Sequence, residues 1–320
     1  MREIDSRVTH HVLKSMNAIS KGRSAVRKFI RQYGWGYLFI FPSMTTFTLF
    51  VLVPVIWSLI ISFQKYSLAR GGTWMDPFYA NYVTAFTFLN NIFVTSIRNT
   101  LIYTVFTVTT SIFLGLILAS LIQPLSHRMR TFFRAAYYLP AVTSALIVGM
   151  TWAYIFNGQW GFANYILRLL GFAPLRWISD PDLALGSVTL SAMLTIPATA
   201  VVLFSAAMGS IPTEYYEAAE LDGASAIRKW WHITVPLIKS TTLYLVVLYT
   251  IASFEVFERI YIMVPSGVGN SVQTIVWQIY SNGFKDFNFG VASAQAFVLF
   301  LIISSIAVFQ FRFLRSDVEY

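Results

Sequence analysis

Long runs of apolar residues, separated by shorter polar segments, dominate the pattern of this chain. Each run exceeds the ~20 residues with which an α-helix crosses the hydrocarbon core of a bilayer. The alternating ten-residue pattern of a membrane β-barrel does not occur in the sequence, so helices are the expected spanning form. The runs predict six membrane spans, over residues 37–63, 100–122, 135–156, 184–208, 241–264 and 289–311.

The first polar segment, residues 1–36, is basic. Its apolar residues Ile4, Val8, Val12 and Met16 recur every fourth position, which is the spacing of one face of a helix. Two interpretations stay open for this segment: a basic amphipathic helix that lies on the membrane surface, or a solvated basic tail.

The distribution of positive charge predicts the orientation. With the N-terminus in the cytoplasm, sixteen of the 23 Lys and Arg residues fall in cytoplasmic segments and seven fall outside. Cytoplasmic segments of membrane proteins carry an excess of Lys and Arg, so both termini are expected to be cytoplasmic. Residues 37–311 then form one membrane domain, with the loop 210–239 and the tail 312–320 on the cytoplasmic side.

The composition agrees with this layout and excludes several kinds of chemistry. Hydrophobic residues make up 56% of the chain and charged residues 12%, against about 25% charged in soluble domains. The absence of cysteine excludes disulfides, thiolate metal sites and a cysteine nucleophile. The sequence also lacks a metal-binding histidine pair and a phosphate-binding glycine-rich loop. We expect an all-α integral membrane protein with no catalytic or metal site. Because orientation explains the net charge of +9, we expect no binding to nucleic acid.

The loop 210–239 carries the clearest local signals. Pro212 suits the start of a helix, which Gly223 is expected to end by taking a left-handed conformation. A second short helix is expected through Trp230, ending near Pro236. Small alanine residues leave a surface that another protein can approach closely. The alternative is an ordinary interfacial helical hairpin.

This loop resembles the cytoplasmic EAA motif of ABC-importer permeases. The matching positions are Glu217, Ala218, Ala219, Asp222, Gly223, Ala224, Ile233 and Pro236. Two positions depart from the family pattern, Val235 in place of a leucine and Ser240 in place of a later proline. Shorter matches resemble the carbohydrate-uptake branch of the family, above all its maltose-type first permease subunit. They are Arg98-Asn99-Thr100, Gly161-x-x-Asn164 and Ser253-Phe254-x-x-Phe257-Glu258.

The resemblance implies a type I ABC importer permease fold with six transmembrane helices, surrounded by the lipids of a bacterial cytoplasmic (inner) membrane. It implies that the chain is not an enzyme and holds no cofactor, because ATP and Mg are bound by two separate ATPase subunits. A second permease subunit, an extracytoplasmic solute-binding protein and an oligosaccharide substrate complete the implied partners. The loop motif is the implied contact with the ATPase subunits.

A secondary transporter driven by an ion gradient is the alternative from another functional class. Such transporters place ionisable residues near the middle of the membrane. Spans two, three, four and six contain no Asp, Glu, Lys or Arg, which disfavours ion coupling.

Span five carries the densest set of candidate substrate-pathway residues, which are Tyr249, Ser253, Phe254, Phe257 and Glu258. The first four lie at spacings of about one helical turn, so most of them are expected to share one face toward a sugar. Packing in the core or at the membrane interface is the alternative for each aromatic residue.

Charged residues near the outer side have two interpretations each. Glu255 and Arg259 either pair along one helix face or line a substrate pathway. The other outward cations considered are Arg70, Arg168, Arg176 and Lys285. They favour an acidic oligosaccharide such as alginate, although docking of a solute-binding protein explains them equally well.

Overall fold

The computed structural model describes residues 32–33, 35–87, 91–265 and 268–314. The chain forms two units, one up to Ile60 and one from Ile61 onward. The expected surface helix or tail before residue 32 and the end of the C-terminal tail lie outside the described residues. The expectations for those segments stay predictions.

The first unit contains all but the last residue of a helix over Trp35–Ile61 that is long and apolar enough to cross a membrane, where the first span was expected. Its last part, α2, covers Val53–Ile61 and follows a π-helical turn, η1, over Thr48–Leu52. Pro54 explains the wide turn. Proline has no N–H, and in a regular α-helix its ring collides with the carbonyl four residues earlier.

The second unit is built mainly from helices. It begins with an antiparallel hairpin of β1 (Gln64–Ser67) and β2 (Gly71–Trp74). Its helices are α3 (Ala80–Thr87), α4 (Ile92–Ile122), α5 (His127–Val142), α6 (Ala145–Ile155), α7 (Phe162–Leu169), α8 (Ala184–Met193), α9 (Ala198–Gly209), α10 (Thr213–Leu221), α11 (Ala226–Lys229), α12 (Val235–Leu237), α13 (Lys239–Phe254), α14 (Glu258–Met263), α15 (Ile275–Tyr280) and α16 (Phe289–Leu314). The π-helical or 3-10 turns are η2 (Trp230–Thr234), η3 (Gly269–Val272) and η4 (Ser281–Lys285).

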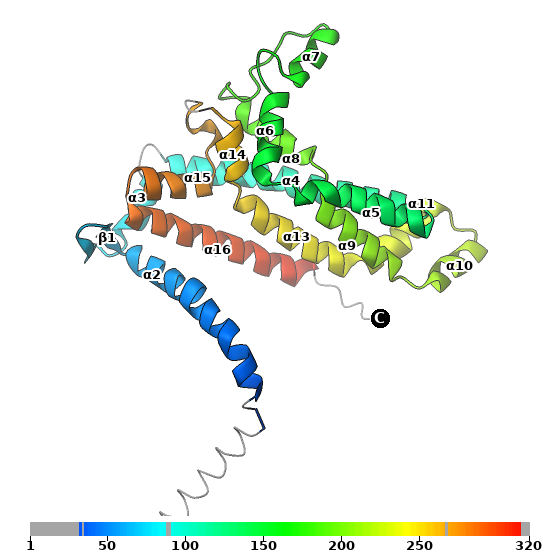
Figure 1. Ribbon diagram of the computed structural model, residues 1–320, viewed down its shortest axis with the longest axis horizontal. Coiled ribbons are helices and arrows are strands. Elements are labelled where there is room, and N and C mark those ends of the chain that lie inside the picture. The colour runs from blue at the N-terminus through cyan, green and yellow to red at the C-terminus, as the bar shows by residue number, and fades with distance from the viewer. Residues whose placement is uncertain (1–31, 34, 88–90, 266–267, 315–320) are drawn as a thin grey trace, which may run out of the picture. The chain divides into compact units, whose positions relative to one another are not determined.

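Within the second unit, α4 packs against α9 and α13, and α13 packs against α16, so these helices run side by side (Figure 1). Small residues allow the backbones of α4 and α9 to approach closely: a Cβ atom on Gly115 would lie 2.5 Å from Cβ of Ala200. The buried side chains of Ala119 and Phe204 continue the same contact. This pair forms the centre of the bundle.

Four helices of the described chain are long and apolar enough to cross a membrane, and the number rises to six when two bent helix pairs count as one span each. The third expected span, 135–156, is one of these pairs, because α5 and α6 meet at 88°. Pro140 lies inside α5, and Thr143 after it is extended. The side chain of Ser144 then starts α6 by accepting a hydrogen bond from the Leu146 N–H. This range is therefore not one continuous helix.

The fifth expected span, 241–264, is also interrupted. Helix α13 ends at Phe254 and α14 begins at Glu258. Within the break, the carbonyl of Val256 accepts a hydrogen bond of 2.9 Å from the hydroxyl of Thr274. The break is therefore a defined feature that connects span five to the start of α15.

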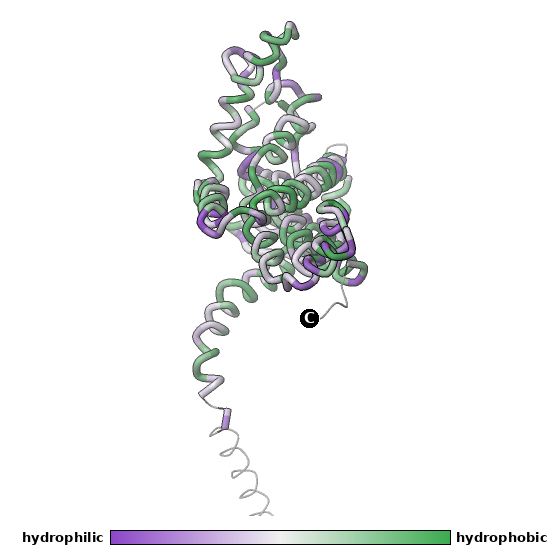
Figure 2. Tube along the Cα trace, turned by 90° about the vertical axis from the view of Figure 1, so that its right-hand side faces the viewer, coloured by the Kyte–Doolittle hydropathy of each residue, from purple (hydrophilic) through white to green (hydrophobic). Residues whose placement is uncertain are grey.

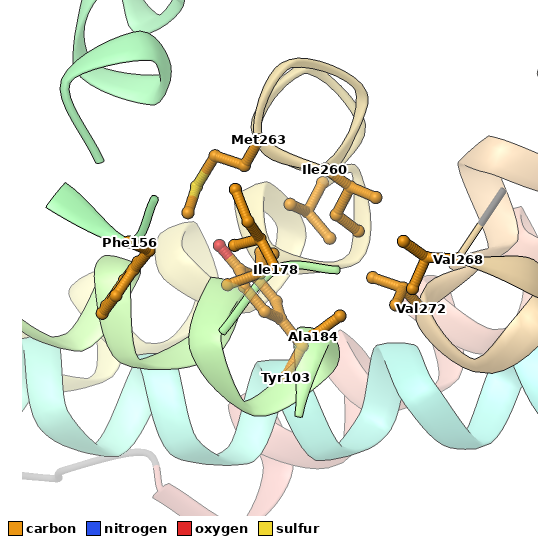
Figure 3. Close-up of a cluster of buried hydrophobic side chains, with 10 residues drawn as sticks. Tyr103, Phe156, Ile178, Ala184, Ile260, Met263, Val268 and Val272 are labelled. Atoms are coloured by element: carbon orange, nitrogen blue, oxygen red, sulfur yellow. The ribbon is translucent and has the colours of Figure 1, made fainter. Parts of the chain in front are cut away.

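Apolar residues predominate along the helices, and hydrophilic residues gather in the turns (Figure 2). The largest buried cluster joins α4, α8 and α14 with the segments around them. Figure 3 shows Phe156, Ile178, Ile260, Met263 and Val272 meeting in this cluster. The cluster fixes α14 and the segment after it to the rest of the second unit.

Candidate functional sites

The loop 210–239 folds into two helical segments joined by a tight turn, as the sequence predicts. Helix α10 ends at Leu221, and Gly223 follows with a φ of +73°. The N–H of Gly223 donates to the Glu220 carbonyl at 3.0 Å, and the N–H of Ala224 donates to the Ala219 carbonyl at 2.9 Å. These two bonds form a Schellman motif. Its left-handed residue favours glycine because a Cβ atom there is sterically unfavourable.

The second helical segment begins at Ser225, whose side chain caps α11. It continues through η2 and α12, contains Pro236 in its last turn and ends at Leu237, where it meets α13 at 67°. An ion pair between Glu220 and Lys229 connects it to α10. The loop is thus a folded hairpin of helices.

Specific polar contacts attach this hairpin to the bundle. The indole N–H of Trp230 donates to the hydroxyl of Ser120 on α4 at 2.8 Å. The hydroxyls of Tyr216 and Thr234 lie 2.9 Å apart and join the two halves of the hairpin. Ile233 packs against the buried cluster between α4 and α9. The hairpin is thus attached to α4 through a hydrogen bond and through apolar packing.

The opposite surface of the hairpin is exposed. Leu221 is 92% exposed and Ile227 is 72% exposed. Glu217, Ala218 and Asp222 of the EAA-like motif are exposed as well. Large apolar side chains that a folded loop presents outward are typical of a contact with another protein.

Three of the five expected pathway residues have side chains that contact neighbouring helices of this chain. The hydroxyl of Tyr249 accepts a hydrogen bond of 3.1 Å from the N–H of Ala200, in the first turn of α9. The hydroxyl of Ser253 lies 3.1 Å from that of Thr107 on α4. Phe254 is 1% exposed and packs in a cluster with residues of α4, α15 and α16. These side chains fix α13 to its neighbours.

The other two expected pathway residues, Phe257 and Glu258, lie beyond the break. Because α13 ends before them, these two residues do not continue the helix that carries Tyr249, Ser253 and Phe254. The break also separates Glu255 from Arg259, and the guanidinium of Arg259 donates to the Ser191 hydroxyl at 3.0 Å. Glu258 begins α14 and is exposed.

Phe257 belongs to a group of five aromatic side chains, which we name the aromatic cluster. Its members are Phe257, Tyr261, Trp277, Tyr280 and Phe284. Their contacting rings have centroids 4.9 to 6.0 Å apart. The ammonium group of Lys285 lies over the rings, 5.1 Å from the centroid of Trp277.

A cavity of about 490 Å³ lies beside the aromatic cluster. Tyr261, Gln273, Trp277 and Lys285 supply its polar and aromatic walls. Ile260, Val268 and Val272 line it as well, and they belong to the buried cluster of Figure 3. Apolar residues, aromatic rings, an amide and one cation therefore face the same space.

Asn99 and Thr100 hold the segment that lines this cavity. The Asn99 amide donates to the carbonyls of Ser271 and Gln273, at 2.8 and 3.0 Å. The hydroxyl of Thr100 accepts a hydrogen bond from the N–H of Ile275 at 3.1 Å. The motif at the start of the second span thus positions the walls of the cavity.

The sequence already drew attention to Phe257 and Lys285, but separately and for different reasons. The aromatic cluster as a unit was missed. Trp277, Tyr280 and Phe284 follow the helical spacing of i, i+3 and i+7, which places them on one face and was the available signal. Across the described residues, no group of three or more His, Cys, Asp or Glu is arranged to hold a metal ion.

The family model for the binding-protein-dependent transport system inner membrane component matches residues 111–318. The chain belongs to this family of ABC-importer permeases, and it is a multi-pass protein of the inner membrane. The arabinooligosaccharides transport system permease protein AraP of Bacillus subtilis is 32% identical over 272 residues, which are 83% of this chain and 84% of AraP.

Two solved structures share the fold. A bacterial ABC transporter involved in the import of the acidic polysaccharide alginate matches with a TM-score of 0.79 and 22% identity, over 92% of this chain and 99% of that chain. A bacterial alginate ABC transporter in complex with an alginate pentasaccharide-bound periplasmic protein matches with a TM-score of 0.78 and 22% identity, over 90% and 96%. The expected all-α, type I ABC importer permease fold is confirmed.

Proposed function

We propose that this chain is one permease subunit of an ATP-driven ABC importer that moves an oligosaccharide into the cytoplasm by alternating access. The observation that carries the proposal is the helical hairpin of the loop 210–239. It is attached to α4 from within and exposes Leu221 and Ile227 on its outer surface. The substrates named for AraP and for the two solved transporters support a saccharide cargo.

The partners follow from this role. Two ATPase subunits bind ATP and Mg, and a second permease subunit completes the membrane pathway. An extracytoplasmic solute-binding protein delivers the oligosaccharide, which is consistent with the periplasmic protein in one of the similar complexes. Both termini and the loop 210–239 lie in the cytoplasm, in agreement with the excess of positive charge there.

Helix α10 is the element that docks on the ATPase subunit. Burial of Leu221 and Ile227 in a groove of that partner removes apolar surface from water, which stabilises the contact. The contact between Trp230 and Ser120 then passes a displacement of α10 to α4. The residues of the EAA-like motif shape this docking surface and its turn.

The pathway runs along the interrupted part of span five. Phe257 and Glu258 lie beyond the end of α13, and we assign to them the direct contacts with the sugar. Tyr249, Ser253 and Phe254 do not contact the sugar. They position α13, because their side chains contact α4, α9 and α16.

Reconstitution of the four-subunit complex in liposomes tests this function. With a solute-binding protein outside and ATP inside, we expect uptake of an oligosaccharide such as an alginate or arabinan fragment. A non-hydrolysable ATP analogue is the control and abolishes uptake. Uptake by this chain alone, driven by a proton or sodium gradient, would refute the proposal in favour of a secondary transporter.

A further inference from the structure

We infer that the cavity beside the aromatic cluster binds one uronate residue of the transported oligosaccharide, with the sugar ring against Tyr261 and Trp277 and its carboxylate on Lys285. This inference rests on the proposed function and assigns the chemistry of its substrate. It concerns a site beyond the break in span five, formed by α14, η3 and the segment from Gln273 to Lys285.

The charge of Lys285 is the first part of the argument. Its ammonium group lies 5.1 Å from the ring centroid of Trp277 and 5.8 Å from that of Tyr280. The ion pairs within 4.0 Å among the described residues do not include Lys285. A positive charge is thus held at the edge of a cavity, where an anionic ligand can pair with it.

The walls are the second part of the argument. The cavity of about 490 Å³ lies within the range of ~300–1,000 Å³ that is usual for small-ligand sites. Tyr261 is 51% exposed, so its ring is open to a ligand. An aromatic ring offers an apolar face to the C–H face of a pyranose. The Gln273 amide donates to Asn270 and accepts from Gln278, which leaves its second N–H and second lone pair for a sugar hydroxyl group.

Preorganisation is the third part of the argument. Asn99 and Thr100 hold the segment from Ser271 to Ile275 through three hydrogen bonds. The apolar floor packs in the buried cluster of Figure 3. A fixed cavity loses little conformational entropy when a ligand binds, so a small number of contacts suffices for recognition.

The position suits a sugar that enters from outside. In Figure 1, α15 lies toward one end of the second unit and the hairpin of α10 and α11 lies toward the other. Because the hairpin is assigned to the cytoplasmic side, the cavity faces the extracytoplasmic half of the pathway.

The test compares Lys285→Gln with Lys65→Gln. Lys65 is a cation of the β1–β2 hairpin that does not line the cavity. Uptake by the full complex is measured with an alginate trisaccharide and with an arabinan trisaccharide. For Lys285→Gln we expect the KM for the alginate fragment to rise by up to about fivefold, the upper end of what an exposed ion pair contributes. The KM for the arabinan fragment stays unchanged. Lys65→Gln and Lys285→Arg keep both values.

A second variant, Trp277→Leu, raises the KM for both fragments, because the ring face contacts any pyranose or furanose. Each variant is first shown to assemble with wild-type yield and melting temperature. An unchanged KM for alginate in Lys285→Gln overturns the inference while the proposed function stands. An equal loss for both cargoes also overturns it and assigns Lys285 to docking of the solute-binding protein. A wild-type complex that imports neither the alginate fragment nor the arabinan fragment refutes the proposed function itself.

Discussion

Substitution of Gly223 by valine isolates the contribution of the turn in the helical hairpin of the loop 210–239. The residue has a φ of +73°, and an added Cβ atom would meet no atom within 4 Å. The penalty therefore comes from the backbone and not from a clash. A left-handed conformation costs a non-glycine residue about 1–2 kcal/mol, and a β-branched residue lies at the upper end. The ratio of native to opened turn falls by about 5–30-fold.

The opened turn loses the two hydrogen bonds that connect Gly223 and Ala224 to the last turn of α10. The exposed Leu221 at the end of α10 then shifts relative to the second helical segment, and the docking surface changes shape. We expect the complex with Gly223→Val to assemble and to hydrolyse ATP, but to import the oligosaccharide at a strongly reduced rate. Parallel measurement of ATP hydrolysis and uptake in the same liposomes gives the ratio of sugar imported to ATP consumed.

Gly171 provides the matched control. It has a φ of +82°, and an added Cβ atom would again meet nothing within 4 Å. Gly171→Val thus carries the same backbone strain in the loop after α7, away from the hairpin. We expect it to retain the ratio of import to ATP hydrolysis. Wild-type import by assembled Gly223→Val complexes would refute the reasoning, and an equal loss in both variants would refute its assignment to the hairpin.

Three further changes test the packing. Gly115→Val places its Cβ atom 2.5 Å from that of Ala200, so we expect the free energy of unfolding to fall by about 1–3 kcal/mol. A lower melting temperature measures this loss, and Gly115→Ala should have a smaller effect. Trp230→Phe and Ser120→Ala remove the same hydrogen bond; a double-mutant cycle in chemical unfolding should give a coupling of about 0.5–1.5 kcal/mol. Asn164→Ala removes a fully buried amide that bonds to five groups of its loop. Faster proteolysis of that loop is expected, and an unchanged rate would contradict the reasoning.

The helical hairpin of the loop 210–239 was predictable from the sequence because its signals are local. A helix start at Pro212, a left-handed Gly223 and an end near Pro236 depend on residues a few positions apart. The attachment of the hairpin was not predictable in the same way. Trp230 and Ser120 are 110 positions apart, and only the packing of α4 against the hairpin brings them together.

The spans were predictable as apolar segments, but the bends and breaks within them were not. Hydrophobicity measures the transfer of a segment into lipid and does not record a bend inside it. The bend of 88° between α5 and α6 depends on Pro140 and on the cap at Ser144. The break before α14 has no proline, and Thr274 from another segment satisfies the carbonyl of Val256 there. A one-dimensional pattern does not contain that tertiary contact.

Helix α13 explains why residues expected in the pathway turn inward. One end meets the helical hairpin of the loop 210–239 at 67°, and the other end lies at the break before α14 and the cavity. Between these ends, the side chains of Tyr249, Thr250 and Ser253 bond to groups of α9, α16 and α4. Close-packed helices with such contacts transmit a displacement and do not absorb it. A push on the hairpin is therefore expected to reach the break as a change of angle between α13 and α14, at the place where the walls of the cavity begin.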